Sequence, residues 1–231
     1  MSTVIITGAS KGIGRATAEL FQTGGHRVIN ISRTACSVDG VENQLIDLTA
    51  TDAATKATEL AATIEPGVIH LVHNAARLTG ESVSSIDIAE YRRTIDINII
   101  APQILNLALL PLMQAGSSII YIGSTLSEKA VPNSFSYVVT KHAGIGMMRA
   151  TCQDLAGTGI HTVCLCPGFT NTEMLRDHVG NSDEILQSIA AGSTFGRLIE
   201  PDEIARSIHF AAENPVLNGA VIHANLGQIE N

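Results

Sequence analysis

The sequence contains no tryptophan, and only 3% of its 231 residues are aromatic. Charged residues are also scarce at 16%, whereas apolar residues make up 45% of the chain. A hydrophobic core must therefore consist mainly of alanine, isoleucine, leucine and valine, and such side chains suit helices packed on a parallel sheet. The length is within the range of one α/β domain, so we expect a single domain over residues 1–231.

Basic residues are outnumbered, because 14 lysines and arginines stand against 22 aspartates and glutamates, for a net charge of −8. This balance argues against non-specific binding to nucleic acid or to anionic membranes. The sequence also lacks a basic-then-apolar leader and any apolar run of about twenty residues. We therefore expect a cytoplasmic protein with no secretion signal and no membrane span.

Cysteine is rare as well and occurs at positions 36, 152, 164 and 166. Cys164 and Cys166 lie two apart in an apolar run, where a strand would place both on the same side. Buried thiols are favoured over a metal pair, because free cysteine is often fully buried and no second Cys or His pair has finger-like spacing. We expect no metal site, and no disulfide framework in a chain with this much core material.

Short β-rich runs alternate with helical stretches, and hairpin signals are absent. The predicted strands are 4–7, 27–32, 43–48, 68–73, 118–123, 160–166 and 220–223, and the predicted helices are 12–23, 51–64, 88–114, 134–156 and one that opens at Pro201. This order predicts an α/β fold, a single doubly wound Rossmann domain with a seven-stranded parallel sheet flanked by helices. Ligands of such folds bind at the carboxyl ends of the strands. The polar stretch 171–196 is expected to form a mobile flap over the substrate.

A glycine-rich loop, residues 7–14 (TGASKGIG), joins the first strand to the first helix. Gly8, Gly12 and Gly14 allow a tight turn and a close approach of the backbone to a pyrophosphate. The free N–H groups of the helix N-terminus can bind such an anion. Three glycines can also simply make a turn, but their position directly after the first strand favours a dinucleotide site.

The end of the second predicted strand has no carboxylate, which a site for NAD would use to bind the ribose 2′-hydroxyl. Ser32 and Arg33 stand there instead. Arg33 can pair with a 2′-phosphate through two hydrogen bonds, Ser32 can add a third, and Lys11 adds positive charge from the loop. Either cation alone could be an ordinary surface residue, but together they favour NADP(H). Asp47 would lie near the adenine edge, or would act only as an N-cap.

Tyr137 and Lys141 are four residues apart near the start of a predicted helix, so they share one face. Ser124 lies thirteen residues before Tyr137, at the carboxyl end of a predicted strand. Reducing a ketone with hydride leaves an alkoxide that needs a proton. A tyrosine hydroxyl is a slow acid near neutral pH because its ordinary pKa is about 10, and a neighbouring ammonium stabilises the phenolate. Ser124 would hold the substrate oxygen.

These motifs, in this order, resemble the classical short-chain dehydrogenase/reductases over essentially the whole chain. The loop 7–14 matches the family's Thr-Gly-x-x-x-Gly-x-Gly. Residues 73–76 (HNAA) are similar to its Asn-Asn-Ala-Gly, and residues 167–172 (PGFTNT) to its Pro-Gly-x-x-x-Thr. His73 and Ala76 depart from the pattern, and the methyl group of Ala76 could crowd the cofactor.

The resemblance implies roles for individual residues, and its catalytic positions fall on Asn98, Ser124, Tyr137 and Lys141. Asn98 would hold a water that links Lys141 to solvent, although capping or kinking the long helix is an open alternative. Lys141 would also contact the nicotinamide ribose, and Thr172 the nicotinamide amide. The implied cofactor contacts are Gly8, Ser10, Lys11, Gly12, Ile13, Gly14, Ser32, Arg33, Asp47, Leu48, Asn74, Ala75, Ala76, Tyr137, Lys141, Pro167, Gly168, Thr170 and Thr172.

Taken together, these features predict an NADP(H)-dependent reductase of ketones or aldehydes that acts on a small molecule. Two alternatives stay open: an alcohol or sugar dehydrogenase running the same site oxidatively, and a regulator that binds NADP without turnover. Because the family's two long helices pack in dimers and tetramers, the resemblance implies a homodimer or homotetramer. His142 is expected to face solvent or an interface, whereas His161 and His209 are expected to be structural, with no partner suggested by the sequence.

Overall fold

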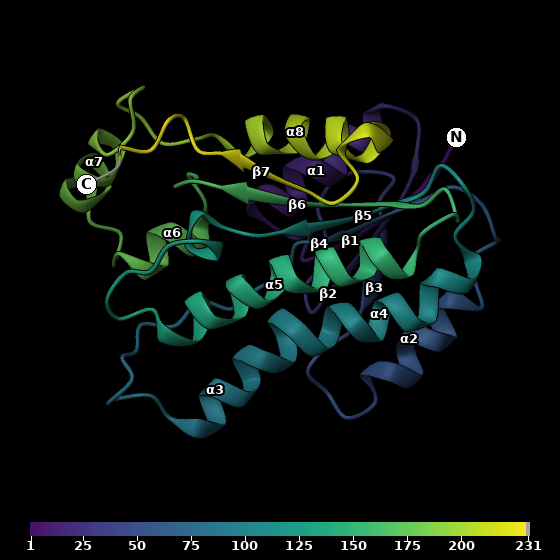
Figure 1. Ribbon diagram of the computed structural model, residues 1–231, viewed down its shortest axis with the longest axis horizontal. Coiled ribbons are helices and arrows are strands. Elements are labelled where there is room, and N and C mark those ends of the chain that lie inside the picture. Colours follow the sequence, from purple (N-terminus) through teal and green to yellow (C-terminus); the bar gives the residue numbers. More distant parts are fainter. Residues whose placement is uncertain (230–231) are drawn as a thin grey trace.

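The computed structural model describes residues 1–229 as a seven-stranded parallel sheet between two layers of helices (Figure 1). Residues 230 and 231 of the predicted domain lie outside the described residues. The strands lie side by side in the order β3-β2-β1-β4-β5-β6-β7, which confirms the predicted doubly wound fold. Their bounds are β1 (Thr3–Thr7), β2 (Arg27–Ser32), β3 (Glu42–Leu45), β4 (Ile69–His73), β5 (Ser118–Ile122), β6 (His161–Pro167) and β7 (Ala220–Ala224).

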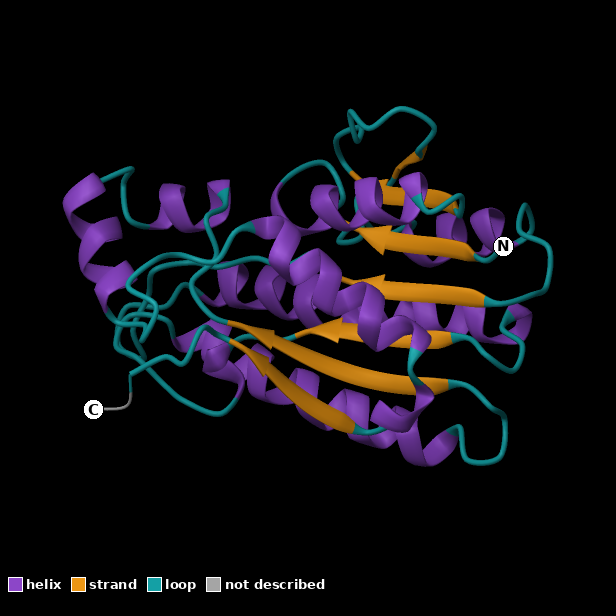
Figure 2. Ribbon diagram, turned by 90° about the horizontal axis from the view of Figure 1, so that it is seen from above, coloured by secondary structure: helices purple, strands orange, loops and turns teal. Residues whose placement is uncertain are grey.

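Helices cover both faces of this sheet. On one face, α1 (Gly12–Thr23) and α8 (Pro201–Glu213) pack against each other (Figure 1). On the other face lie α2 (Ala53–Ala61), α3 (Ile88–Ile95), α4 (Ala101–Leu109) and α5 (Phe135–Asp154). The short helices α6 (Glu173–His178) and α7 (Asp183–Ala191) stand beyond the carboxyl ends of the strands (Figures 1 and 2). The 3₁₀ turn η3 (Thr125–Ser127) follows β5, and the 3₁₀ turn η4 (Pro215–Leu217) follows α8.

Alternate residues of the central strands form two separate cores, because successive strand side chains point to opposite faces. In β1, Ile5 packs with the cluster beneath α2, α4 and α5. Its neighbours Val4 and Ile6 belong to the opposite cluster, which includes Phe21 of α1 and Ile208 of α8. All five side chains are fully buried. The two cores pack against both faces of the strands. This packing fixes the positions of the carboxyl ends of the strands relative to one another.

The helix predicted over residues 88–114 is interrupted. After α3 the chain makes a π-helical turn, η1 (Asp96–Ile100), before α4 begins, and a 3₁₀ turn, η2 (Leu110–Leu112), ends the segment. Pro102 gives a physical reason, because proline has no N–H to donate to the carbonyl of Asn98 four residues earlier. Regular α-helical bonding is therefore impossible at this point of the helix.

Other boundaries also differ from expectation. The third strand ends at Leu45, so Asp47 lies beyond it; this is an edge strand, and Leu45 is 61% exposed. β6 ends at Pro167, one residue beyond the predicted end of this strand at residue 166. The stretch 171–196 is largely helical, because the side chains of Thr172 and Ser182 accept N–H groups at the starts of α6 and α7. Its predicted mobility stays a prediction.

The continuous helical segment 88–112 is long and apolar enough to cross a membrane by length and composition, with a mean hydropathy of 1.5. Core helices of water-soluble proteins meet the same criterion. Here the segment packs with α2 and α5 over the sheet. The expected absence of a membrane span and the expected cytoplasmic location stay predictions.

Candidate active site at the carboxyl edge of the sheet

The glycine loop turns from β1 into α1 at the carboxyl edge of the sheet. Gly8 and Gly12 have φ of +71° and +56°, a region that residues with a Cβ rarely adopt. A Cβ on Gly14 would lie 2.4 Å from the carbonyl oxygen of Gly8 and 2.5 Å from Nδ2 of Asn74. The backbone conformation therefore favours glycine at positions 8 and 12, and packing requires it at position 14.

The start of α1 is suited to an anion. Lys11 at the N-cap makes no side-chain capping hydrogen bond, and the first turn of α1 contains no acidic residue. Among the described residues, no side chain accepts a hydrogen bond from the first turn of α1, although the carboxylate of Glu173 lies nearby, with its Oε2 3.6 Å from the position of a Cβ on Gly12. This open, glycine-lined helix end fits the diphosphate of a dinucleotide.

Thr7, which was not among the predicted site residues, ties the loop to the end of β4. Its hydroxyl oxygen accepts the N–H groups of Asn74 and Ala75, each at 2.9 Å. In return, Nδ2 of Asn74 donates to the carbonyl oxygens of Thr7 at 2.9 Å and Gly8 at 3.1 Å. These bonds close the gap between β1 and β4, where the direction of the crossover connections reverses. The only signal for Thr7 in the sequence is its place in the glycine motif.

Asn30 is a second residue that the sequence did not indicate. It is fully buried in β2, and its Oδ1 accepts the N–H of Ala9 at 3.0 Å. Its Nδ2 donates to Oδ1 of Asn43 at 2.9 Å. A polar residue inside an otherwise apolar strand was the available signal, because buried amides need partners.

The residues predicted to select NADP lie on the glycine loop and at the end of β2. Oγ of Ser32 is 3.5 Å from Oγ of Ser10, and both Lys11 and Arg33 are exposed. The N–H and hydroxyl of Thr49 hold the pKa of Asp47 below its ordinary value, with the charge of Arg33 contributing. Asp47 is thus a turn-forming carboxylate within the electrostatic reach of Arg33.

Two further predicted cofactor contacts have limited side-chain access. Leu48 is 6% exposed and belongs to the hydrophobic core. Ile13 packs partly against the core beneath α1 and α8. Any contact with a cofactor at Leu48 would therefore involve its backbone.

Ser124 follows β5 and opens the 3₁₀ turn η3. Its Oγ accepts the N–H of Leu126 at 3.1 Å, and Oγ of Ser127 accepts the N–H of Ser124 at 3.1 Å. This reciprocal capping box fixes the Ser124 side chain. Because its oxygen is already used as an acceptor, the hydroxyl proton is the part available to a substrate.

Tyr137 and Lys141 lie on the first turns of α5, which packs against η3. Lys141 is buried, with Nζ 5.3 Å from the centroid of the Tyr137 ring. Its Nζ donates to the carbonyl oxygen of Ile122 at 2.7 Å, at the end of β5. The lysine is thus held between strand and helix, with its charge directed toward the half-buried tyrosine.

Asn98 lies in the π-helical turn η1. Its side chain accepts the N–H of Arg77 at 2.8 Å and donates to the Arg77 carbonyl at 3.1 Å. Nδ2 also donates to Oγ1 of Thr140 at 2.9 Å, and Thr140 donates to the carbonyl of Tyr137 at 3.0 Å. The side chain therefore fixes α5 relative to the segment after β4. A water relay through Asn98 stays a prediction.

Glu81 holds the amino end of α5 in place, although no feature of the sequence indicated it. Its carboxylate Oε1 accepts the N–H of Ser136 at 2.8 Å and the Ser136 hydroxyl at 2.5 Å. Its carbonyl accepts the N–H of Phe135 at 3.1 Å. Acidic groups are favourable at a helix N-terminus, and this one fixes the turn that carries Tyr137.

Residues 167–172 pass from β6 to α6 alongside the glycine loop. A Cβ on Gly12 would be 3.2 Å from Cγ2 of Thr172, which places the two segments in contact. The N–H of Gly168 donates to the carbonyl of Ala224, and a Cβ on Gly168 would be 2.9 Å from Cα of Asn225. The hydroxyl of Thr170 donates to the carbonyl of Gly168 at 3.1 Å. A cleft of about 350 Å³ between α1 and α6 borders Gly12 and Thr172.

His73, one of the departures from the family pattern, points away from this edge. Its Nε2 donates to Oδ1 of Asn106 at 2.8 Å, and Nδ2 of Asn106 donates to the Tyr121 hydroxyl at 2.9 Å. Burial lowers the pKa of His73 to about 4. The neutral imidazole therefore forms part of a buried polar chain under α4. Ala76, the other departure, is half-buried beside the site.

Cys164 and Cys166 are buried free thiols on β6, as expected. They lie directly behind Gly123, where a Cβ would approach their sulfur atoms to 2.9 and 2.7 Å. Hydrogen bonds from Cys164 and Ser127 hold the pKa of Cys166 below its ordinary value. These thiols therefore support the strand end from which Ser124 projects.

The comparisons with known proteins agree with this arrangement. Residues 8–228 match the family described as enoyl-(acyl carrier protein) reductase. A 2-keto-3-deoxy-L-fuconate dehydrogenase from Xanthomonas campestris is 32% identical over 91% of this chain and 73% of its own length. A chloroplastic NADPH-dependent aldehyde reductase-like protein from Arabidopsis thaliana is 26% identical over 97% of this chain and 93% of its own.

A solved structure has a closely similar fold. The crystal structure of a short chain dehydrogenase family protein from Francisella tularensis superimposes with a TM-score of 0.89. It covers 98% of both chains at 29% identity. The likeness thus extends from the glycine loop to the last strand.

Proposed function

The chain belongs to the short-chain dehydrogenase/reductase family of oxidoreductases, and we propose that it interconverts a carbonyl and an alcohol by hydride transfer with NADP(H). The observation that carries this proposal is the constellation on α5 and η3. A buried ammonium, Lys141, lies 5.3 Å from the ring centroid of Tyr137, and Ser124 heads the turn against which α5 packs. A carbonyl oxygen between the two hydroxyl groups would be held and protonated from the same side.

Bound NADPH would supply the hydride. Ser124 donates its free hydroxyl proton to the substrate oxygen and so orients the carbonyl. Tyr137 transfers its proton to the developing alkoxide, and Lys141 stabilises the resulting phenolate through its nearby charge. The Ile122 carbonyl holds Lys141 in place, while Glu81 and Thr140 hold the helix turn that bears Tyr137.

The choice of NADP over NAD rests on the end of β2. Ser32 and Arg33 stand where a carboxylate would be needed for NAD, and exposed Lys11 adds a second cation from the loop. Oδ1 of Asp47, farther along the chain, accepts both the N–H and the hydroxyl of Thr49. The name of the Arabidopsis relative, which includes NADPH, supports the same choice.

The test of this assignment is Tyr137→Phe. We expect turnover to fall by about 10²–10⁴-fold, as for the loss of a general acid, while NADPH binding stays nearly intact. Tyr91→Phe on α3, which removes a hydroxyl outside this constellation, is the matched control. Undiminished turnover of the Tyr137 variant would refute the catalytic role of Tyr137, whereas NADPH binding without turnover by the parent chain would favour the regulator alternative.

One relative favours a second candidate, oxidation of a sugar acid. The 32% identical Xanthomonas protein is named a dehydrogenase of such a compound. The same site performs oxidation when Tyr137 starts as the base. Assays with carbonyl compounds and NADPH, and with hydroxy sugar acids and NADP, would separate the two directions. A crotonyl thioester serves as a further probe, because the matched family is described as an enoyl reductase.

We propose that the chain forms oligomers through the outer surface of α4 and α5. Leu107 of α4 is 68% exposed and Val139 of α5 is 39% exposed, so the outer surface of this layer offers apolar side chains to a second copy. A homodimer or homotetramer would cover them. Light scattering coupled to size-exclusion chromatography tests this expectation.

A further inference from the structure

Four of the eight histidines gather at the amino edge of the sheet, opposite the candidate active site. His26 precedes β2, His70 lies in β4, His161 begins β6 and His209 lies near the end of α8. His161 donates from Nε2 to the carbonyl of Ala211, and His70 pairs with Ser118. These two are structural. His26 and His209 have a different arrangement.

His209 and Glu213 form one half of the arrangement. They are four residues apart on α8, with Nδ1 of His209 3.5 Å from Oε2 of Glu213. Such a pair is common on a helix surface and needs no ligand. The sequence suggested no partner for His209, because the third member comes from a segment more than 180 residues earlier.

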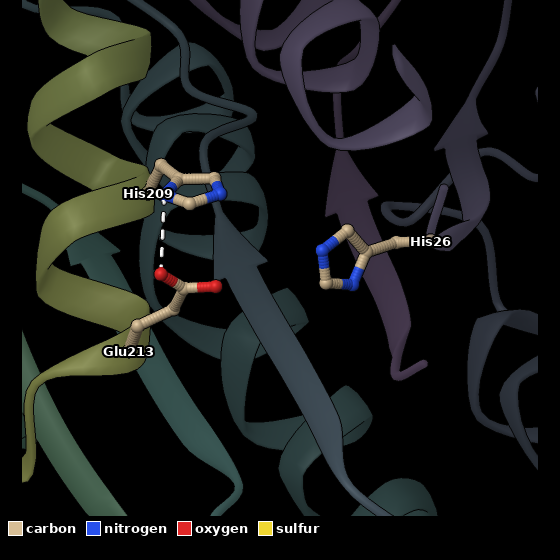
Figure 3. Close-up of side chains that lie close together, drawn as sticks. All are labelled: His26, His209 and Glu213. Atoms are coloured by element: carbon tan, nitrogen blue, oxygen red, sulfur yellow. Dashed lines mark ion pairs between the residues drawn. The ribbon is translucent and has the colours of Figure 1, made fainter. Parts of the chain in front are cut away.

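That third member is His26, in the turn between α1 and β2. Ser2 Oγ lies 2.7 Å from its Nδ1 and fixes the ring. Nε2 is left without a bond and faces His209 and Glu213 (Figure 3). One donor atom from each of the three residues lies within 4.8 Å of the others.

Phe21 holds both imidazoles in position. Its ring centroid is 5.4 Å from that of His26, in an edge-on contact, and 4.8 Å from that of His209. Burial lowers the pKa of His26 below its ordinary value, although Glu213 opposes this effect. A neutral imidazole with a free, oriented nitrogen is the form that binds metal ions.

We propose that His26, His209 and Glu213 bind a divalent transition-metal ion, with zinc as the best match. Two imidazoles and one carboxylate are a common zinc ligand set, and imidazole ligands disfavour magnesium and calcium. Tetrahedral zinc with bonds of about 2.0–2.1 Å needs donors about 3.4 Å apart. A pair of donors at the 4.8 Å limit must therefore close by about 1.4 Å, and the half-exposed Glu213 side chain can rotate to shorten its own distances.

The position of the site determines its role. It joins α8 to the turn before β2, at the end of the sheet away from Ser124 and Tyr137. Bound zinc therefore links α8 to the turn after α1 and stabilises the fold, without contact with Ser124 or Tyr137. The remaining coordination position is open to water, since His209 and Glu213 are 30% and 46% exposed.

The experiment uses the untagged full chain, freed of metal by a chelator and titrated with zinc and separately with cobalt. We expect one ion per chain by calorimetry and visible absorption typical of low-coordinate cobalt. A hundredfold excess of zinc over its Kd should raise the melting temperature by about 5–10 °C. His26→Gln and His209→Gln should each weaken zinc binding at least about tenfold and abolish most of this rise.

The controls separate ligand loss from general damage. His142→Gln removes an exposed histidine from α5 and should bind zinc like the parent chain. Glu213→Gln replaces a half-exposed carboxylate by a neutral group of the same shape, so it decides the matter if a histidine variant fails to fold. The proposal would be overturned if neither zinc nor cobalt bound at one ion per chain. Binding that persists unchanged in the His26, His209 and Glu213 variants would also overturn it.

Discussion

Replacing Thr7 by valine is expected to loosen the junction between the glycine loop and β4. Valine has nearly the same shape as threonine but cannot accept a hydrogen bond. The N–H groups of Asn74 and Ala75, both 2.9 Å from the Thr7 oxygen, would lose their shared acceptor. Thr7 itself is 3% exposed, so water has little access to the vacated position.

The expected loss follows from those two bonds. An unpaired buried N–H costs about 1–3 kcal/mol, which sums to about 2–6 kcal/mol for both. Asn74 and Ala75 are only half-buried, so water replaces part of the bonding and the lower end applies. A loss of about 2–3 kcal/mol lowers the melting temperature of a chain of this size by about 5–10 °C.

Thr7→Ser is the matched control, because it keeps the hydroxyl and loses only a methyl group, about 1 kcal/mol. Thermal unfolding followed by circular dichroism compares the two variants. NADPH titration should show weaker binding for the valine variant alone. A valine variant that melts as high as the serine variant would refute the reasoning.

Three more outcomes are expected. Gly14→Ala should weaken NADPH binding about tenfold or more, because its Cβ would lie 2.4 Å from the Gly8 oxygen. Gly67→Ala places its Cβ in open space and should leave NADPH binding unchanged. Equal effects of the two substitutions on NADPH binding would count against the proposed cofactor site. Arg33→Ala should raise KM for NADPH about 10–100-fold through a lost charged hydrogen bond and leave KM for NADH unchanged. A parallel rise in both KM values would exclude recognition of the 2′-phosphate by Arg33. His73→Asn should reduce the pH dependence of stability. Burial holds the folded pKa of His73 at about 4, below its unfolded value, so between about pH 6.5 and 4 the folded chain binds fewer protons than the unfolded chain. His73 therefore accounts for a loss of about 3 kcal/mol in the parent chain as the pH falls through that window, which the variant should not show, while His70, whose pKa is also lowered to about 4, keeps its own contribution. Chemical denaturation at several pH values measures the difference.

Much of the edge that carries the site was predictable, because its residues belong to contiguous motifs. The glycines of the loop, the pair Tyr137 and Lys141, and Ser124 after a strand each follow from local spacing and the rule that ligands bind at carboxyl ends. The structure brings these segments to one edge. Whether each residue acts as predicted requires the variants described above.

The supporting residues were not predictable for a physical reason. Thr7 reaches Asn74, and Glu81 reaches Ser136, across 67 and 55 residues of sequence. No periodicity links such positions, and a single threonine or glutamate has many possible roles. The proximity of His26 and His209 could not be predicted for the same reason, since only the packing of α1 on α8 brings the two histidines together.

The π-helical turn η1 has a consequence for how chains of this kind change length. Such a turn contains one residue more than the α-helical turn it replaces. Removing a residue from 96–100 would leave an α-helical number of residues in this turn and α4 facing the sheet as before, while Pro102 would still lack the N–H needed for a regular bond. Removing one from within α4 would instead rotate the remainder by about 100° and expose Leu105 and Leu109, which are now fully buried. A single-residue change of length that keeps Asn98 is therefore better accommodated in this turn than in α4, because the buried face of α4 keeps its orientation.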